Sequence, residues 1–130
     1  MIPQDVAAMV RIAIVGDYLL IRKLLKLQVE IEQNFVVIGE MENSTALAAL
    51  VPYLQPDVIL IDIDMKDREG IQAIQKIRET DPAVKIITLG FDDNYNTRRQ
   101  AIAAGADCHV SKQAGSPTLV SAIHRVAQDR

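Results

Sequence analysis

The sequence is poor in several kinds of residue, and each scarcity excludes a class of protein. Its 130 residues include one cysteine, Cys108, so an internal disulfide and a cysteine-rich zinc site are both excluded. Tryptophan is absent and aromatic residues make up 4%, which argues against a surface that binds nucleic acid by base stacking. The formal net charge of −3 disfavours binding to a nucleic-acid backbone or to a membrane surface.

Long apolar runs are also missing. No stretch approaches the roughly 20 residues that cross a bilayer, and the N-terminal MIPQDVAAM lacks the basic start and apolar centre of a signal peptide. Hydrophobic residues nevertheless make up 49% of the chain, enough for the core of one domain of this length. Because the single cysteine also fits a reducing compartment, we expect a cytoplasmic protein with one domain over residues 1–130, of which 1–9 form an N-terminal extension.

Short runs rich in valine and isoleucine recur along the chain. Their centres lie about 24 residues apart, which is too far for hairpins and enough for a strand followed by a crossover helix. Since nearly every position in these runs is apolar, both faces of the resulting sheet should be covered. The expected strands are 11–15, 35–39, 58–61, 84–89 and a weaker 108–110.

Helical patterns fill the intervals between these runs. The first has an apolar stripe at helical spacing, which lies away from its basic side chains. This stripe consists of Leu20, Leu24, Leu27 and Ile31, and we interpret RKLLK (22–26) as a solvated helix face. The expected helices are 19–33, 44–54, 70–80, 94–105 and 116–128.

Several helix ends carry recognisable signals. The triplet NST at 43–45 suits an N-cap, and Pro52 is expected to end or kink the helix that follows it. Gly105 is expected to form a C-cap. Ser116 is expected at an N-cap, with Pro117 at the first helical position.

Five strands that alternate with five helices predict an α/β fold. The fold is a doubly wound, flavodoxin-like parallel sheet with the strand order 2-1-3-4-5 and helices on both faces. In such a sheet the ligand binds at the carboxyl ends of the strands, beside the switch point between strands 1 and 3. That edge is therefore where the functional residues should lie.

Charged residues follow the strands at this edge. Asp62 and Asp64 follow the third strand, Asp17 follows the first, and Lys112 follows the fifth. Clustered carboxylates repel one another, and Mg²⁺ is a cation that one or two carboxylates hold together with water or phosphate. A lysine suits a phosphoryl oxygen, and an aspartate can act as a nucleophile that forms an aspartyl phosphate. These residue types predict metal-assisted phosphoryl transfer onto a carboxylate.

The segments that carry these residues resemble a known family. The stretches RIAIVGDYLLIRKLL, PDVILIDIDMKDREGIQAIQKIR and AIAAGADCHVSK are similar to the CheY-like receiver domains of two-component response regulators. The resemblance covers essentially the whole chain. It is closest to the LuxR/NarL type, in which the receiver precedes a helix-turn-helix DNA-binding domain.

The resemblance implies a role for each residue at the sheet edge. Asp62 would be the phosphoacceptor, and Lys112 would pair with the phosphoryl group. Mg²⁺ would be held by Asp17, by Asp62 and by the backbone carbonyl of Asp64. The expected class is a signalling domain rather than an enzyme, with at most a self-catalysed phosphoryl transfer from a phosphodonor.

The chain also departs from the family pattern. Gly16 stands where receivers have an additional acidic residue, and His109 stands where they have a switch aromatic. Gly90 stands where a Thr or Ser hydroxyl binds the phosphoryl group. A hydrogen bond to a charged group contributes about 1.5–3 kcal/mol, and full switching requires about 5.5 kcal/mol. Gly90 is therefore expected to weaken the conformational switch while leaving phosphorylation chemically feasible.

Asp64 leads to a separate hypothesis. In an extended chain it points to the same side as Asp62, and its carboxylate would then replace the acid missing at Gly16 in holding Mg²⁺. Asp67 and Glu69 are interpreted as turn and cap residues before the next helix.

Two functions remain open on the sequence alone. The first is a phosphorylation-controlled receiver whose partner is a sensor histidine kinase or a phosphotransfer protein. The second is a degenerate receiver that acts as a protein–protein or dimerisation module without phosphorylation. A homodimer would form through the face of the fourth and fifth strands and helices, and DNA would be bound only through an output domain absent from this chain. A dehalogenase-like phosphatase, suggested by DIDMK (62–66), is disfavoured because the motif follows the third strand rather than the first.

Overall fold

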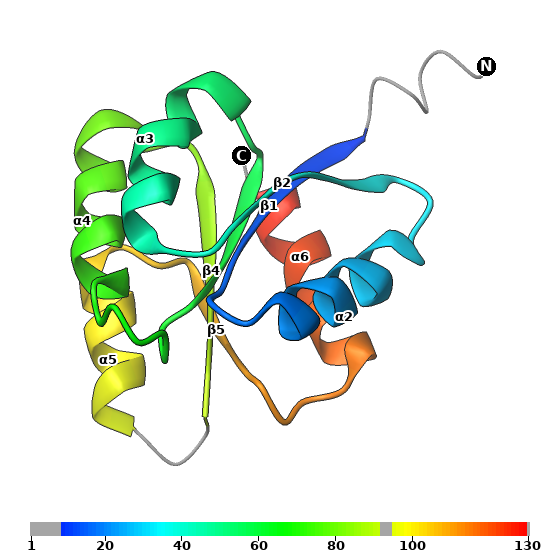
Figure 1. Ribbon diagram of the computed structural model, residues 1–130. Helices are drawn as coiled ribbons and strands as arrows, with labels where there is room; N and C mark the ends of the chain where they lie inside the picture. The colour runs from blue at the N-terminus through cyan, green and yellow to red at the C-terminus, as the bar shows by residue number, and fades with distance from the viewer. Residues whose placement is uncertain (1–8, 92–94, 130) are drawn as a thin grey trace.

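The computed structural model describes residues 9–91 and 95–129 (Figure 1). Residues 1–8 of the expected N-terminal extension, and Asn94 at the start of an expected helix, lie outside this part. The strands are β1 (Val10–Val15), β2 (Phe35–Met41), β3 (Val58–Asp62), β4 (Lys85–Gly90) and β5 (Cys108–Ser111). The helices are α2 (Leu19–Glu30), α3 (Ser44–Leu54), α4 (Gly70–Thr80), α5 (Tyr95–Ala104) and α6 (Ser116–Gln128).

The five strands form one parallel sheet in the order β2-β1-β3-β4-β5. This confirms the predicted fold class and strand order. Helices α3, α4 and α5 cover one face of the sheet, and α2 and α6 cover the other (Figure 1). None of the helices described is long and apolar enough to cross a membrane.

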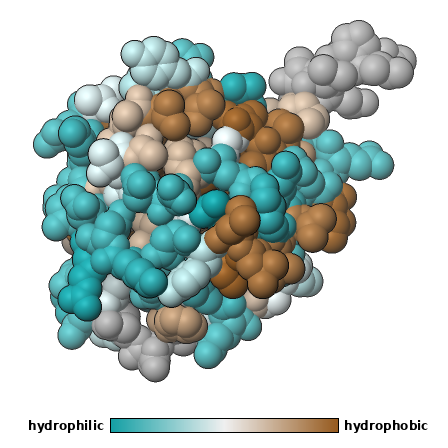
Figure 2. Space-filling view, in the orientation of Figure 1, coloured by the Kyte–Doolittle hydropathy of each residue, from teal (hydrophilic) through white to brown (hydrophobic). Residues whose placement is uncertain are grey.

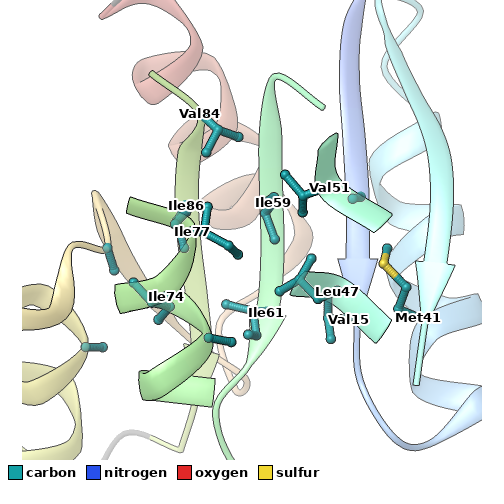
Figure 3. Close-up of a cluster of buried hydrophobic side chains, with 14 of the residues drawn as sticks. Val15, Met41, Leu47, Val51, Ile59, Ile61, Ile74, Ile77, Val84 and Ile86 are labelled. Carbon is teal, nitrogen blue, oxygen red and sulfur yellow. The ribbon is translucent and has the colours of Figure 1, made fainter. Parts of the chain in front are cut away.

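Each face of the sheet has its own apolar core. All five residues of β3 are buried, and because side chains alternate along a strand, β3 contributes to both cores. On one face, Ile59 and Ile61 pack beneath Leu47 of α3 and Ile74 of α4 (Figure 3). On the other face, the core residues of the strands pack against Val29 of α2 and against Leu119 and Ile123 of α6.

Two of the expected helix ends differ from the structure. Pro52 does not end its helix, because α3 continues to Leu54 and Gln55 forms the C-cap with a φ of 50°. Proline removes a hydrogen bond to the turn before it and leaves the N–H groups that follow it free to bond, so Tyr53 and Leu54 remain helical and the Gln55 N–H reaches the Val51 carbonyl at 2.9 Å. Gly115, not Ser116, is the N-cap of α6, so that Ser116 already lies in the helix.

The other two signals are confirmed. The side chain of Asn43 caps α3 by accepting a hydrogen bond from the Ala46 N–H at 2.7 Å. Gly105 follows α5 with a φ of 124°, and a Cβ there would lie 2.6 Å from Cγ of Arg78. Both the backbone conformation and the available space therefore require glycine at this position.

Helix α2 turns its apolar stripe away from the core. Leu20 is 70% exposed and Leu27 is 67% exposed, and Figure 2 shows hydrophobic side chains gathered over this helix. The buried residues of α2 are Arg22 and Val29, so the interpretation of 22–26 as a solvated face is wrong for Arg22. The guanidinium of Arg22 donates to the Gly16 carbonyl, and its Nε lies 3.4 Å from Glu40 Oε1 without a hydrogen bond, so the opposite charge of Glu40 partly offsets its burial.

Candidate functional site

The carboxyl edge of the sheet brings Asp62 and Lys112 into contact. Asp62 is the last residue of β3 and is 4% exposed, while Lys112 directly follows β5. The backbone N–H of Lys112 donates to the Gly90 carbonyl at 2.8 Å, which fixes the start of the loop after β5. From this position, Lys112 Nζ reaches Asp62 Oδ1 at 2.8 Å.

The environment of Asp62 acts on its pKa in opposite directions. Burial raises the pKa of this carboxyl above its ordinary value, and the Lys112 ammonium and the Asp64 N–H oppose that rise. The Asp64 N–H donates to Asp62 Oδ1 at 2.8 Å, so both stabilising contacts use the same oxygen. Asp62 is therefore a buried carboxylate held in one orientation.

Asp17 lies in the loop that follows β1. Its Oδ2 accepts a hydrogen bond from the Lys66 N–H at 2.8 Å, which joins the loop after β1 to the loop after β3. Its Oδ1 is buried and lacks a hydrogen-bond partner among the residues described. A buried carboxylate oxygen without a donor carries a large desolvation cost that a bound cation would offset.

Asp64 points toward β4 and β5. Its Oδ2 lies 3.3 Å from Lys112 Nζ and accepts the Phe91 N–H at 3.1 Å. Lys112 thus bridges Asp62 and Asp64, and a single ammonium faces two carboxylates. The side chain of Asp64 is 31% exposed, whereas that of Asp62 is 5% exposed.

The donor set at this edge fits a magnesium ion that is held largely by solvent or phosphate. In the described part of the chain, no group of three or more His, Cys, Asp or Glu side chains is arranged to hold a metal. Mg²⁺, however, is commonly held by one or two carboxylates and keeps several waters. Asp62 and the buried, unpartnered oxygen of Asp17 satisfy that smaller requirement.

Space is available for a side chain at Gly16. A Cβ there would lie 3.7 Å from Asp62 Cβ and 3.7 Å from Arg22 Cγ, which are ordinary van der Waals distances. The first atom of a side chain at position 16 would therefore meet no steric obstacle.

Gly90 is different, because its neighbours fill the space that a side chain would need. A Cβ there would lie 3.0 Å from His109 Cε1 and 3.2 Å from Ile63 Cγ1. One pleat deeper in β4, the fully buried Thr88 hydroxyl lies 2.8 Å from His109 Nδ1. The role of Ile63 was not foreseen from the sequence, where its only signal is an apolar residue between two aspartates.

Asp67 joins two loops beside the site. Its carboxylate accepts the Ser44 N–H at 2.9 Å and the Glu69 N–H at 3.0 Å. Burial acts to raise the pKa of Asp67, but these hydrogen bonds outweigh it and the net pKa is lowered. The interpretation of Asp67 as a turn residue is confirmed, and its contact with the first residue of α3 was not foreseen.

A cavity of about 590 Å³ adjoins the site. Its polar end includes Gly16, Asp62 and Lys112, and its apolar walls include Leu24 of α2 and Leu119 of α6. The sequence pattern predicted a ligand site at this edge but did not indicate the apolar walls of the cavity, because these depend on how α2 and the loop after β5 are placed.

Comparison with known proteins identifies similar sequences. A sequence model of the response regulator receiver domain matches residues 12–124. The transcriptional regulatory protein YdfI of Bacillus subtilis is 33% identical over 109 residues, which cover 84% of this chain and 51% of that protein. The chemotaxis protein CheY of Halobacterium salinarum is 31% identical over 117 residues, which cover 89% of this chain and 95% of that protein. The chain spans about half the length of the first curated relatives that it matches.

Solved structures share the fold. A LuxR-family two-component response regulator from Aurantimonas superposes with a TM-score of 0.88 and 25% identity, over 94% of this chain and 87% of that one. The receiver domain of the response regulator NarL from Mycobacterium tuberculosis gives a TM-score of 0.87 and 24% identity, over 94% of this chain and 98% of that one.

Proposed function

The chain belongs to the response regulator receiver domain family, and on this premise we propose that it accepts a phosphoryl group on Asp62 in a two-component phosphorelay. Receivers of this family are signalling domains. The observation that carries the proposal is the contact of 2.8 Å between the buried Asp62 carboxylate and the Lys112 ammonium at the carboxyl edge of the sheet.

The transfer requires Asp62 as the nucleophile. One of its carboxylate oxygens attacks the phosphorus of a phosphohistidine, the new O–P bond forms, the P–N bond breaks, and the imidazole leaves. The Lys112 ammonium favours the ionised form of Asp62 and faces the site where the phosphoryl oxygens arrive. Asp17, Asp62 and the Asp64 carbonyl would hold Mg²⁺, which neutralises charge on the transferring group when it is bound.

The readout of phosphorylation is proposed to be weak. No side-chain hydroxyl is available at Gly90, and Ile63 and His109 occupy the adjacent space. The same observation favours the second candidate, a degenerate receiver that acts as an interaction or dimerisation module whether or not it is phosphorylated. The two candidates differ in whether Asp62 forms an adduct and in whether the adduct changes the conformation.

A sensor histidine kinase or a phosphotransfer protein is the proposed partner, and its proposed contact is the outer face of α2. The exposed stripe there runs alongside the cavity that opens on Asp62. Contiguous apolar patches that are exposed on a protein surface commonly mark sites of protein–protein interaction. Its members are Leu20, Leu24, Leu27 and Ile31.

The proposal also includes the regulated output, the dimer interface and the location of the protein. The regulated output is transcriptional, by analogy with the longer LuxR- and NarL-type relatives, and DNA is contacted by a domain outside this chain. The proposed homodimer uses the face formed by β4, β5, α5 and α6. The proposed location is the cytoplasm, where the phosphodonor is made.

Incubation with Mg²⁺ and a small acyl phosphate tests the proposal. The wild-type protein should gain one phosphoryl group by intact mass, and Asp62→Asn should gain none. A wild-type protein that stays unmodified would favour the degenerate receiver. If the adduct formed without any change in the NMR spectrum of the backbone amides, Asp62 would be a working acceptor and the conformational switch would be defective.

A further inference from the structure

Two donors at the carboxyl edge of the sheet, the Lys112 ammonium and the Phe91 N–H, are already bound by the carboxylate of Asp64. Lys112 Nζ lies 3.3 Å from Asp64 Oδ2, and the Phe91 N–H donates to the same oxygen at 3.1 Å. Asp64 follows the phosphoacceptor by two residues, and its own N–H donates to Asp62. The loop therefore holds the Asp64 carboxylate directly beside Asp62.

A phosphoryl group on Asp62 would need these same donors. Lys112 Nζ is 2.8 Å from Asp62 Oδ1, so it lies within reach of oxygens attached to that carboxylate. Phe91 directly follows β4, the strand that pairs with β3 at Asp62. The hydroxyl that would add a further donor is missing because position 90 is glycine. The donors that remain therefore carry more of the interaction.

We propose that Asp64 is a built-in competitor of the phosphoryl group. Its carboxylate occupies the position of a phosphoryl oxygen, between the Lys112 ammonium and the Phe91 N–H. It must leave before a phosphoryl group on Asp62 can bind there. The inference rests on the proposed function of Asp62 as a phosphoacceptor.

Charge supports this inference. One ammonium faces two carboxylates before any phosphoryl group arrives, and a phosphoryl group would add further negative charge at the same place. Like charges at such short distances repel one another, so the Asp64 carboxylate and the phosphoryl group would compete for the same ammonium. Since the Asp64 side chain is partly exposed, it can turn out to solvent, and the competition would then cost binding affinity rather than block the site.

This role predicts the opposite result from the role considered for Asp64 in the sequence analysis. A carboxylate that replaces the acid missing at Gly16 would help to hold Mg²⁺, and its loss would weaken the site. A competitor for the phosphoryl donors would hinder occupation of the site, and its loss would strengthen it. The sign of the effect of one substitution therefore separates the two roles.

The test measures beryllofluoride binding at saturating Mg²⁺ by fluorine NMR, with each variant first titrated with Mg²⁺ alone. Asp64→Asn should bind the analogue at least tenfold more tightly than the wild type, and Asp64→Ala should change it in the same direction. Glu69→Gln is the matched control, because it removes one negative charge from the same loop at an exposed side chain. Its affinity should stay within twofold of the wild type.

Each outcome decides the matter. Unchanged or weaker binding by Asp64→Asn, when the wild type binds, would overturn the competitor role and leave Asp62 as the phosphoacceptor. If neither protein bound the analogue, the acceptor function and the competitor would both be lost. If Asp64→Asn bound the analogue and the wild type did not, the result would support both the acceptor function of Asp62 and the competitor role of Asp64.

Discussion

At the scale of single residues, the site depends on the Asp62 carboxylate, whose burial lowers the stability of the fold. Burial raises the pKa of Asp62 above its ordinary value of 3.8, despite the opposing ammonium of Lys112. Between that value and the raised pKa, the folded state binds more protons than the unfolded state, so stability falls as the pH rises through this window. At neutral pH the ionised Asp62 therefore destabilises the fold.

Asp62→Asn should consequently raise the free energy of unfolding at neutral pH. The amide oxygen can still accept from Lys112 and from the Asp64 N–H, so the geometry is retained. Urea denaturation across a pH series measures the difference, which should shrink as the pH falls toward 3.8. A variant that is less stable than the wild type at neutral pH would contradict this interpretation of the burial.

The two glycines of the site should respond differently to a methyl group. At Gly90 the new Cβ would lie 3.0 Å from His109 and 3.2 Å from Ile63. We expect Gly90→Ala to destabilise the protein by about 1–3 kcal/mol. Gly16→Ala, the matched control, meets only ordinary contacts of 3.7 Å and should change stability by less than about 1 kcal/mol.

Denaturant titration of both variants, together with Gly90→Ala in an Ile63→Val background, would check this expectation. Ile63→Val removes Cδ1, which would lie 3.3 Å from the new Cβ, so partial rescue would identify Ile63 as one source of the overpacking beside His109. Equal effects at the two glycines would show that position 90 is not crowded.

At the scale of elements, α2 is the helix for which sequence reasoning and structure differ most. Periodicity identified the apolar stripe on this helix, but it did not show that another face of the helix packs against the sheet. The buried face contains Arg22 and Val29. Arg22 can be buried there because it contacts the Gly16 carbonyl and Glu40. A pattern of side chains on one helix cannot reveal partners that come from β1 and β2.

The outward stripe makes a prediction about stability and partner binding. Leu27→Lys should change the free energy of unfolding by less than about 0.5 kcal/mol, because Leu27 is 67% exposed. It should also reduce phosphotransfer from the partner kinase by at least tenfold while leaving reaction with a small acyl phosphate unchanged.

Val29→Ala is the matched control on the same helix. Val29 is fully buried, so its truncation should cost about 1–3 kcal/mol and should leave kinase recognition intact in the folded fraction. Denaturation and phosphotransfer assays on both variants separate the two faces of α2. Undiminished transfer by Leu27→Lys would place the kinase contact elsewhere.

At the scale of the whole molecule, the order of the strands is what assembles the site. Asp62 and Lys112 come from separate strands, and the parallel sheet brings both to the same edge. Strand spacing and apolar runs were sufficient to predict that edge. They could not predict that the Asp64 carboxylate binds Lys112 and the Phe91 N–H, or that Ile63 and His109 fill the space beside Gly90, because these contacts depend on side-chain packing among loops.

The central claim is that Asp62 at this edge accepts the phosphoryl group. In its most direct test, the protein is incubated with Mg²⁺ and an acyl phosphate, and the product is then reduced with borohydride. Borohydride converts an aspartyl phosphate to homoserine. Peptide mass spectrometry then locates the modified residue. We predict homoserine at position 62 and none in the sample without phosphodonor. Homoserine at position 17 or 64, or an unmodified chain, would contradict the claim.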